Sequence, residues 1–546
     1  MFTRPDAGST VARVLLTLLG ICLAVASPTN AYTQAGLYET DIRGAGRQLL
    51  ATLPNVTTNP DPVAAEAQCC AILQSVGFTP TPGVPVFVVD TNGKAVGGGG
   101  VGQDGQAITG NNNGQDAQYV PMQMCTCSAG VTNATYSGPG RVRLRGGNNS
   151  ALRDTIRQYY IKLPQSEPLG GLPENKNWVF RGPQNDTLGL HEYLAMNLSG
   201  ELGWWSPRTK YGELFLIEDG QPISTTMDYQ GITVLEEHVD QSKNRLNISK
   251  LRVDDEDITG GYIIEYKHGD NPKNEPEINC TITKMPWIVK YPGGFNMTKL
   301  NYIQGYVNDF EAALFGPNFK DPVEGWRKFA NPDTFVDWFL IMEIVKNAKH
   351  TYHGTSFANK DKGKRLDMGP VWSPKNGFGT CCGFPVDGFN NGGVSNGTSG
   401  GSAISPSGWL FNICNETSRC DHDPNFPLAL WFVRLWEDPA FVQDCVARWT
   451  QMRATAWSDA AIAASLSQVQ GYLLPTALRG FARWANVLLA PYGVTDPTAF
   501  YNQAFTTLSS WTLQRVAWLD GAFGDVAAAG NVIVPYGTAP SIATAG

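Results

Sequence analysis

The period of the apolar residues changes along the chain, and this change limits the fold more than any other feature. In the first half, short segments rich in β-branched and aromatic residues alternate with turn residues, which is typical of strands. After Tyr302 the apolar residues recur at i, i+3 and i+4, the spacing of an amphipathic helix. A strand-rich half followed by a helical half indicates the α+β class, with an antiparallel sheet first and helices after it.

These patterns predict the positions of individual strands and helices. The predicted strands are 85–91, 142–145, 159–163, 211–218, 232–237 and 262–266. The predicted helices are 63–76, 188–203, 302–315, 334–347, 428–435, 439–454, 458–474, 478–489 and 500–521. Asn92-Gly93 predicts a tight hairpin turn, and Asp333 is the expected N-cap of helix 334–347.

The N-terminus has the pattern of a secretory signal peptide. Arg4 and Arg13 precede the apolar stretch Val14–Ala26, and small residues then lead to Ala31. We therefore expect residues 1–31 to be cleaved and the protein to be secreted. This N-terminal stretch is the only long uninterrupted apolar run, and it falls well short of the ~20 residues that a membrane-spanning helix needs, so we expect no membrane span.

The cysteine count agrees with export. The chain has 11 cysteines, and removal of Cys22 with the signal peptide leaves an even number, as a disulfide framework requires. Their spacing does not fit a zinc site. The pairing stays open, although Cys414 and Cys420 could close a small loop. The cysteines expected in disulfides are Cys69, Cys70, Cys125, Cys127, Cys280, Cys381, Cys382, Cys414, Cys420 and Cys445.

Glycosylation sequons and net charge narrow the class of protein further. Asn-x-Ser/Thr sequons are frequent, which predicts a glycoprotein with these asparagines at the surface. The expected sites are Asn55, Asn133, Asn185, Asn197, Asn247, Asn279, Asn296, Asn396 and Asn415, whereas the sequon at Asn148 lies inside a motif described below. The formal charge is −8 without long basic blocks, which excludes nucleic acid as an expected partner.

Several segments in order resemble the CotH family of secreted, atypical protein-kinase-like proteins, named for a spore-coat kinase. The segments are Val142–Ser150 (VRLRGGNNS), Tyr159–Leu163 (YYIKL), Gly231–Glu237, Gly260–Glu265, Asp337–Asn347, Gly369–Trp372 and Gly377–Gly379. The resemblance implies a two-lobed kinase-like fold. We expect it over residues 84–490 with an insertion at 376–427, after an N-terminal segment 32–83 and before a C-terminal helix and tail 491–546.

The resemblance also implies nucleotide-binding residues. A kinase needs a lysine for the nucleotide phosphates and a glutamate that holds it. Lys162 would be the phosphate-contacting lysine, with Glu237 as its carboxylate partner and Glu236 as the neighbouring alternative. Arg145 would contact phosphate or form a salt bridge on the sheet, and Asn347 would belong to the same site.

The chain departs from the family where catalysis needs acids. The family reads Asn-x-Asp and Trp-Asp-x-Asp, whereas this chain reads Asn347-Ala348-Lys349 and Trp372-Ser373-Pro374-Lys375. The three acidic positions are thus Lys349, Ser373 and Lys375. Because Mg²⁺ binds oxygen ligands and an ammonium group offers none, we expect no metal site and assign no catalytic residue.

Other motifs offer alternatives. A rewired site could use Asp361, Asp367, Asp387, Asp421 or Asp423. His350 and His353 have no evident third ligand for zinc. The G-x-S-x-G match at Gly397–Gly401 lacks the strand-turn-helix context of a hydrolase nucleophile, and the acidic run Asp254–Asp257 does not have the spacing of a calcium loop.

The leading hypothesis is therefore a secreted CotH-like pseudokinase that acts by binding a protein partner, which the sequence does not identify. No cofactor is assigned with certainty, although ATP could bind without Mg²⁺. Two other functions remain open: an active secretory-pathway or extracellular protein kinase that uses displaced acids, and a surface or matrix adhesin.

Overall fold

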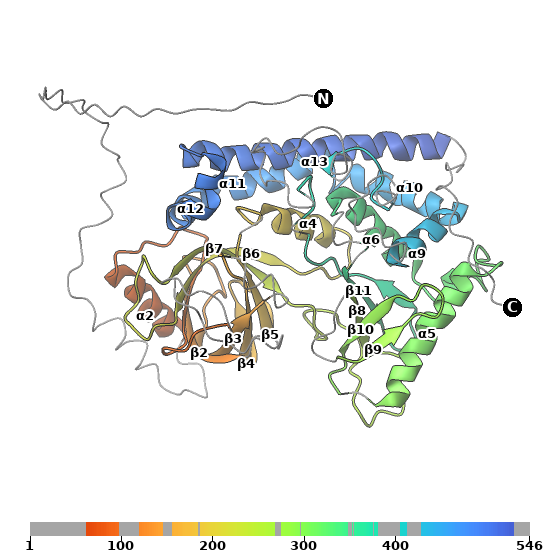
Figure 1. Ribbon diagram of the computed structural model, residues 1–546, viewed down its shortest axis with the longest axis horizontal. Coiled ribbons are helices and arrows are strands. Elements are labelled where there is room, and N and C mark those ends of the chain that lie inside the picture. Colours follow the sequence, from red (N-terminus) through yellow and green to blue (C-terminus); the bar gives the residue numbers. More distant parts are fainter. Residues whose placement is uncertain are drawn as a thin grey trace, which may run out of the picture. The chain divides into compact units, whose positions relative to one another are not determined.

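The computed structural model describes most of the chain after residue 61. The described residues are 62–97, 119–145, 155–183, 186–267, 275–294, 296–347, 352, 354–374, 376–380, 404–411 and 427–528. They contain both sheets and helices, so the α+β class is confirmed (Figure 1).

The first sheet closes into a barrel with the strand order β1-β2-β3-β4-β5-β7-β6. Each pair of neighbours is antiparallel except β1 and β6, which run parallel and close the barrel. The strands are β1 (Val86–Asp90), β2 (Val120–Cys127), β3 (Ser137–Leu144), β4 (Tyr159–Leu169), β5 (Leu172–Arg181), β6 (Thr209–Ile217) and β7 (Tyr229–Glu237).

Side chains alternate between the two faces of this barrel, as the period of a strand requires. On β4, Ile161 and Leu163 belong to the interior core, whereas Tyr160 and Lys162 point outward. Every residue of β7 is buried, because its outer face is covered by helix α11 (Asp459–Arg483). The outer face of the barrel is therefore divided between helix-covered strands and a more open part on β3, β4 and β5.

The second sheet has the order β12-β11-β8-β10-β9 and is antiparallel. Its strands are β8 (Tyr262–Lys267), β9 (Glu277–Asn279), β10 (Pro286–Tyr291), β11 (Gly354–Lys360) and β12 (Leu366–Met368). The sequence patterns predicted β8 alone, because β9 and β12 are short and β10 is interrupted by Lys290.

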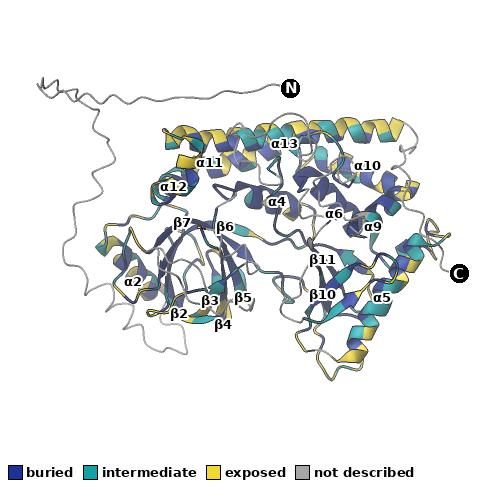
Figure 2. Ribbon diagram, in the orientation of Figure 1, coloured by how far each residue is buried: buried dark blue, intermediate teal, exposed yellow. Residues whose placement is uncertain are grey.

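Helices form the largest core together with this second sheet. Helix α6 lies at its centre and is buried from Thr334 to Val345 (Figure 2). The helices are α2 (Pro62–Ser75), α4 (Leu190–Gly200), α5 (Met297–Phe315), α6 (Pro332–Val345), α9 (Pro427–Trp436), α10 (Pro439–Arg453), α11, α12 (Ala485–Leu488) and α13 (Pro497–Ala528), with 3-10 turns at Trp326–Lys328 and Ala490–Tyr492. Within the described segments, no helix is both long enough and apolar enough to span a membrane.

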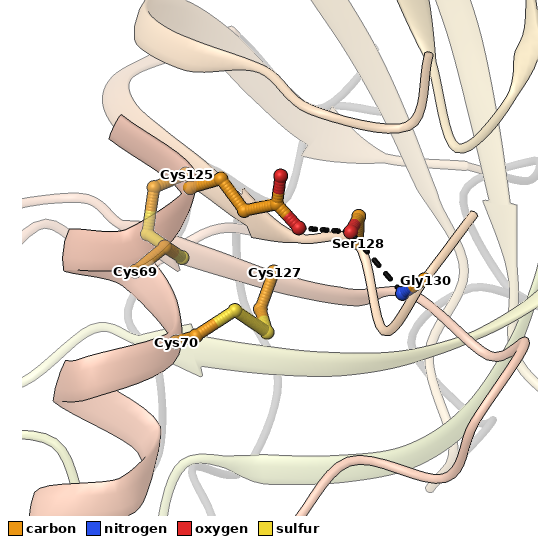
Figure 3. Close-up of a disulfide and its surroundings, with 7 residues drawn as sticks. Cys69, Cys70, Cys125, Cys127, Ser128 and Gly130 are labelled. Atoms are coloured by element: carbon orange, nitrogen blue, oxygen red, sulfur yellow. Dashed lines mark hydrogen bonds between the residues drawn. A yellow bond between two sulfur atoms is a disulfide. The ribbon is translucent and has the colours of Figure 1, made fainter. Parts of the chain in front are cut away.

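Helix α2 is attached to the outer face of the barrel by two disulfides. Cys69 pairs with Cys125 and Cys70 with Cys127, so adjacent helix positions are joined to positions two apart on β2 (Figure 3). Residues of α2 share an apolar cluster with β1, β2 and β6. The expected N-terminal segment 32–83 therefore contributes a helix that is covalently bound to the barrel.

Two of the expected disulfide cysteines are free. Cys280 and Cys445 are buried thiols without a disulfide partner, which corrects the prediction for these positions. Both belong to the largest core, and among the described residues neither forms a disulfide. Cys381, Cys382, Cys414 and Cys420 lie outside the described residues.

Three local predictions differ from the structure. Residues 91–97 form no strand, and the strand that pairs antiparallel with β1 is β2, which begins at Val120, so Asn92-Gly93 does not form a tight hairpin. Asn331 caps helix α6 instead of Asp333, because its side chain accepts the Asp333 backbone N–H and Pro332 occupies the first turn. Pro475 lies inside α11, which runs through the gap expected between helices 458–474 and 478–489.

The described sequon asparagines are all exposed, as glycosylation would require: Asn133, Asn197, Asn247, Asn279 and Asn296. Asn55, Asn148, Asn185, Asn396 and Asn415 lie outside the described residues. Glycosylation itself stays a prediction.

The cysteine assignment can be tested by alkylation. In denaturant without a reducing agent, iodoacetamide should modify Cys280 and Cys445 and leave the four disulfide cysteines of α2 and β2 unmodified. In the native protein both free thiols should react slowly, because burial raises the pKa of each and lowers its thiolate fraction. Peptide mass mapping provides the readout, and an unmodified Cys280 in denaturant would contradict the assignment.

Candidate functional site

A cluster of buried charges lies on the outer face of the barrel, centred on Arg181 at the end of β5. Glu236 of β7 binds this guanidinium with both oxygens: one accepts from Nη2 at 2.7 Å, and the other from Nε. Glu192 of α4 places its Oε1 3.1 Å from the same Nη2. Although burial lowers the pKa of Arg181, the two carboxylates raise it above its ordinary value. One cation thus joins two strands to a helix.

Glu192 lies in the first turn of helix α4, and Asp186, which precedes the helix, holds this turn in place. The carboxylate of Asp186 accepts the backbone N–H groups of Leu190, His191 and Glu192. These N–H groups have no partner inside a helix, so Asp186 satisfies them and stabilises the helix dipole. Glu192, in this first turn, is directed toward Arg181 and is 2% exposed.

A second arginine and an indole ring complete the cluster. Arg145 follows β3, and its Nη1 donates to Gln158 Oε1 at 2.8 Å. The guanidinium carbons of Arg145 and Arg181 lie 5.5 Å and 4.9 Å from the ring centroid of Trp372, within cation–π range. Burial and the neighbouring Arg181 lower the pKa of Arg145.

Both arginines retain unused donors. Arg145 Nε and Arg181 Nη1 are buried and have no hydrogen-bond partner. Buried N–H groups of charged side chains are normally paired, because an unpaired one costs about 1–3 kcal/mol or more. These two donors are therefore candidates for binding an anionic group, the planar guanidinium being suited to phosphate and carboxylate.

A cavity of about 230 Å³ opens next to this cluster. Trp372 and Tyr160 lie between the two features, since Tyr160 is within cation–π range of Arg145, Trp372 is within that range of both arginines, and both rings line the cavity. Lys290 lines the cavity and forms ion pairs with Glu275 at 2.7 Å and Glu265 at 3.5 Å, which also line it. The remaining lining residues are Tyr119, Arg143, Ile161, Asn177, His238, Val239 and Phe357.

The loops that carry the altered family motif meet beside Trp372. Asn347 Nδ2 donates to the backbone carbonyl of Ser373 at 3.2 Å, and both residues are buried. Ser373 and Lys346 adopt left-handed backbone conformations, with φ of 53° and 47°. Such conformations in residues with a Cβ concentrate at functional sites. Lys349 and Lys375 lie outside the described residues.

The expected pair of Lys162 and Glu237 is not formed. Lys162 is exposed on the outer face of β4, whereas Glu237 shares the inward-facing register of Leu235 at the end of β7. Glu237 instead accepts from Arg208 Nε at 2.9 Å, from Arg208 Nη2 at 2.6 Å and from Arg245 Nη1. The alternative partner, Glu236, is bound to Arg181.

The acids considered as replacements have structural roles where they are described. Asp361 accepts the backbone N–H groups of Ser249 and Lys362, and Asp367 accepts from Asn331. Asp387, Asp421, Asp423, His350 and His353 lie outside the described residues. In the part of the chain that is described, no group of three His, Cys, Asp or Glu side chains could hold a metal ion.

The sequence reasoning missed Arg181, Glu192 and Trp372 as members of one site. Asn175, Lys176 and Asn177 interrupt the apolar pattern of β5, so this strand was not predicted. A usable signal was present in Trp178-Val179-Phe180, an apolar run that ends in a single arginine and precedes a helix with an acid in its first turn.

The contacts of Glu237 predict unequal effects on stability. Glu237→Gln should lower the free energy of unfolding by about 3–5 kcal/mol, because the buried Arg245 loses its carboxylate. Lys162→Ala should change it by less than about 0.5 kcal/mol, since the side chain is exposed. Urea unfolding measures both, and similar losses in the two variants would instead favour a Lys162–Glu237 pair.

Comparison with known proteins agrees with the segments noted in the sequence. A family model described as CotH kinase protein matches residues 142–519, which include the barrel strands β4 to β7 and helices α4 to α12. No curated protein matches the sequence. Because the family match covers most of the chain, the protein belongs to the CotH kinase family.

Proposed function

We propose that this protein is a secreted pseudokinase of the CotH family that binds an anionic ligand without a metal ion. The observation that carries the proposal is the pair of buried, unused guanidinium donors on Arg145 and Arg181 beside Trp372. They lie next to a loop in which Ser373 replaces an acid of the family.

The arrangement of Arg181 supports a kinase-derived site. Protein kinases hold the nucleotide phosphates with a lysine on a strand that is ion-paired to a glutamate on a helix. Arg181 on β5 and Glu192 on α4, the next helix along the chain, form such a strand-to-helix pair. We assign to Arg181 the phosphate-binding role that the resemblance implied for Lys162.

The residues at the three acidic positions of the family motif do not suit metal-dependent phosphoryl transfer. Mg²⁺ in kinases is held by carboxylate and amide oxygens that bridge it to the phosphates. Ser373 offers a neutral hydroxyl, and Lys349 and Lys375 bring positive charge to the sequence positions of the other two acids. Asn347 uses its amide nitrogen to hold the Ser373 carbonyl, although its buried Oδ1 is unpaired.

The cavity supports a nucleotide as the anionic ligand. Four aromatic side chains line it, namely Tyr119, Tyr160, Phe357 and Trp372, and aromatic walls suit a planar base. We propose that the barrel-bearing part and the helical part are the two lobes of a kinase-like fold, with phosphates at Arg145 and Arg181 and the base in this cavity.

Secretion and glycosylation complete the proposal. Two disulfides between α2 and β2 are compatible with an oxidising compartment, and the described sequon asparagines are exposed. Outside the cell, the protein would recognise a protein partner through the proposed nucleotide-binding site or through the surface around it.

Binding of ATP without metal tests the proposal. In buffer with a chelator, the protein should bind ATP, and added salt should weaken binding through screening. Arg145→Met should weaken binding at least about tenfold because it removes one charge-assisted contact of about 1.5–3 kcal/mol. Arg141→Met is the matched control: an exposed arginine on β3, the strand that Arg145 follows, expected to leave binding unchanged.

Calorimetry provides this readout, with Lys162→Met as a third variant. A loss of affinity with Lys162→Met equal to that with Arg145→Met would return the phosphate-binding role to Lys162. Absence of ATP binding under every condition would favour a surface or matrix adhesin instead.

Phosphotransfer distinguishes the pseudokinase from an active kinase. The unmodified protein should transfer no phosphate from ATP with Mg²⁺ or Mn²⁺, because the metal-binding acids are replaced. The triple variant Lys349→Asp, Ser373→Asp and Lys375→Asp should make ATP binding depend on Mg²⁺. Robust Mg²⁺-dependent phosphorylation by the unmodified protein would show that displaced acids catalyse the reaction.

A further inference from the structure

Two carboxylates share one guanidinium group at the proposed anion site. Glu236 binds Arg181 at Nε and Nη2, and Glu192 lies 3.1 Å from the same Nη2. Both glutamates and the arginine are buried, each no more than 4% exposed. Since the better-aligned hydrogen bonds go to Glu236, Glu192 is the carboxylate that is held less firmly.

The hydrogen bonds around Glu192 are compatible with a protonated carboxyl group. Its Oε1 is buried and has no aligned hydrogen-bond donor, even though Arg181 is within ion-pair distance. A water-sized cavity of about 20 Å³ is lined by Glu192, Arg181, Gln158 and Asp186. A neutral carboxylic acid fits this position because it loses little when one of its oxygens has no donor.

The charge of the cluster depends on that proton. The carboxylate of Asp186 is bound to the backbone N–H groups at the N-terminus of α4, so the charges that remain are Arg145 and Arg181 against Glu192 and Glu236. With both glutamates ionised these four charges cancel, and they give an anion no net attraction. With Glu192 protonated, one positive charge is in excess. An anion that binds Arg145 and Arg181 would therefore favour the protonated form of Glu192.

The charged and titratable groups around Glu192 come from several elements. Arg181 faces it from β5, Glu236 from β7, Arg145 from the end of β3 and Asp186 from the turn before α4. Tyr160 on β4 is close enough to Arg181 to raise its pKa, and burial together with Asp186 raises the pKa of Tyr211 on β6. Helices α6 and α13 also contact α4, and their buried charges Glu343 and Arg515 pair with each other.

We propose that anion binding at Arg145 and Arg181 is coupled to protonation of Glu192, so that the ligand and one proton bind together. The inference rests on the proposed function and adds a regulatory property to the same site. A secreted protein with this coupling would hold its ligand in neutral or acidic surroundings and release it in alkaline ones.

The direction of the pH dependence follows from the environment of Glu192. Burial raises the pKa of Glu192 to about 8, because Arg181 offsets only part of the desolvation and Glu236 adds to it. The carboxyl is thus mostly protonated at pH 7 and ionised at pH 9.5. Above pH 8, linkage to one proton weakens binding by up to about tenfold per pH unit.

The test uses ATP in metal-free buffer with a chelator between pH 7.5 and 9.5, where its phosphates are fully ionised. Calorimetry in two buffers of different ionisation enthalpy counts the protons taken up on binding. For the unmodified protein we expect affinity to fall about 20-fold over this range, with uptake approaching one proton at the upper end.

Two variants assign the proton. Glu192→Gln keeps the shape of the side chain without its titration, so affinity should be the same at pH 7.5 and 9.5 and proton uptake should vanish. Glu201→Gln changes an exposed glutamate at the C-terminus of the same helix and should behave as the unmodified protein.

The outcomes separate the two proposals. Binding of ATP with no proton uptake, or an unchanged pH dependence in Glu192→Gln, would overturn the coupling and leave the proposed function standing. No ATP binding at any pH would overturn the proposed function and the coupling with it. The proton count on the unmodified protein decides the coupling even if Glu192→Gln does not fold.

Discussion

The site depends on the buried ion pairs that the guanidinium group of Arg181 forms with two glutamates. This guanidinium group joins β5 to β7 through Glu236 and the barrel to α4 through Glu192. A buried ion pair seldom adds net stability compared with apolar packing, but the loss of one partner leaves an unpaired charge in a dry interior. The cluster therefore fixes the position of α4 on the barrel, and with it the apolar residues through which α4 enters the helical core.

The two-residue period of the strands explains which sequence predictions succeeded. Fold class and most elements followed from apolar patterns, because each pattern is local. The pairing of Lys162 with Glu237 failed because it depends on which face of a closed barrel each residue occupies. That face is set by the register of both strands with β5, where Lys162 pairs with Asn177 and Glu237 pairs with the next residue, Trp178. The pairing of β5 with β7 joins residues far apart in the chain and leaves no local pattern in the sequence.

The pairing of the cysteines also depends on contacts between residues that are far apart in the sequence. Cys125 and Cys127 lie two apart on β2 and hence on one face of the strand, while Cys69 and Cys70 are adjacent on a helix. Nothing local selects these partners until α2 is placed on the outer face of the barrel by its apolar cluster. An even number of cysteines supports a disulfide framework, yet Cys280 and Cys445 are simply small apolar residues in a core.

The loop at Ser373 is held through its backbone, so its shape does not depend on the side chain at this position. Asn347 holds the loop through the carbonyl of Ser373, and a carbonyl is present whatever the side chain. The side chain at position 373 can therefore change without loss of the hydrogen bond to Asn347. The charge of that side chain influences whether a cation or an anion is attracted to the loop. Two unit charges ~4 Å apart interact by about 4 kcal/mol at the effective dielectric near a protein surface. In the proposed function, a loop without these acids offers no carboxylate to a divalent cation, while Arg145 and Arg181 attract an anion when Glu192 is protonated. The proposed loss of metal ligands is therefore compatible with metal-free binding of an anion.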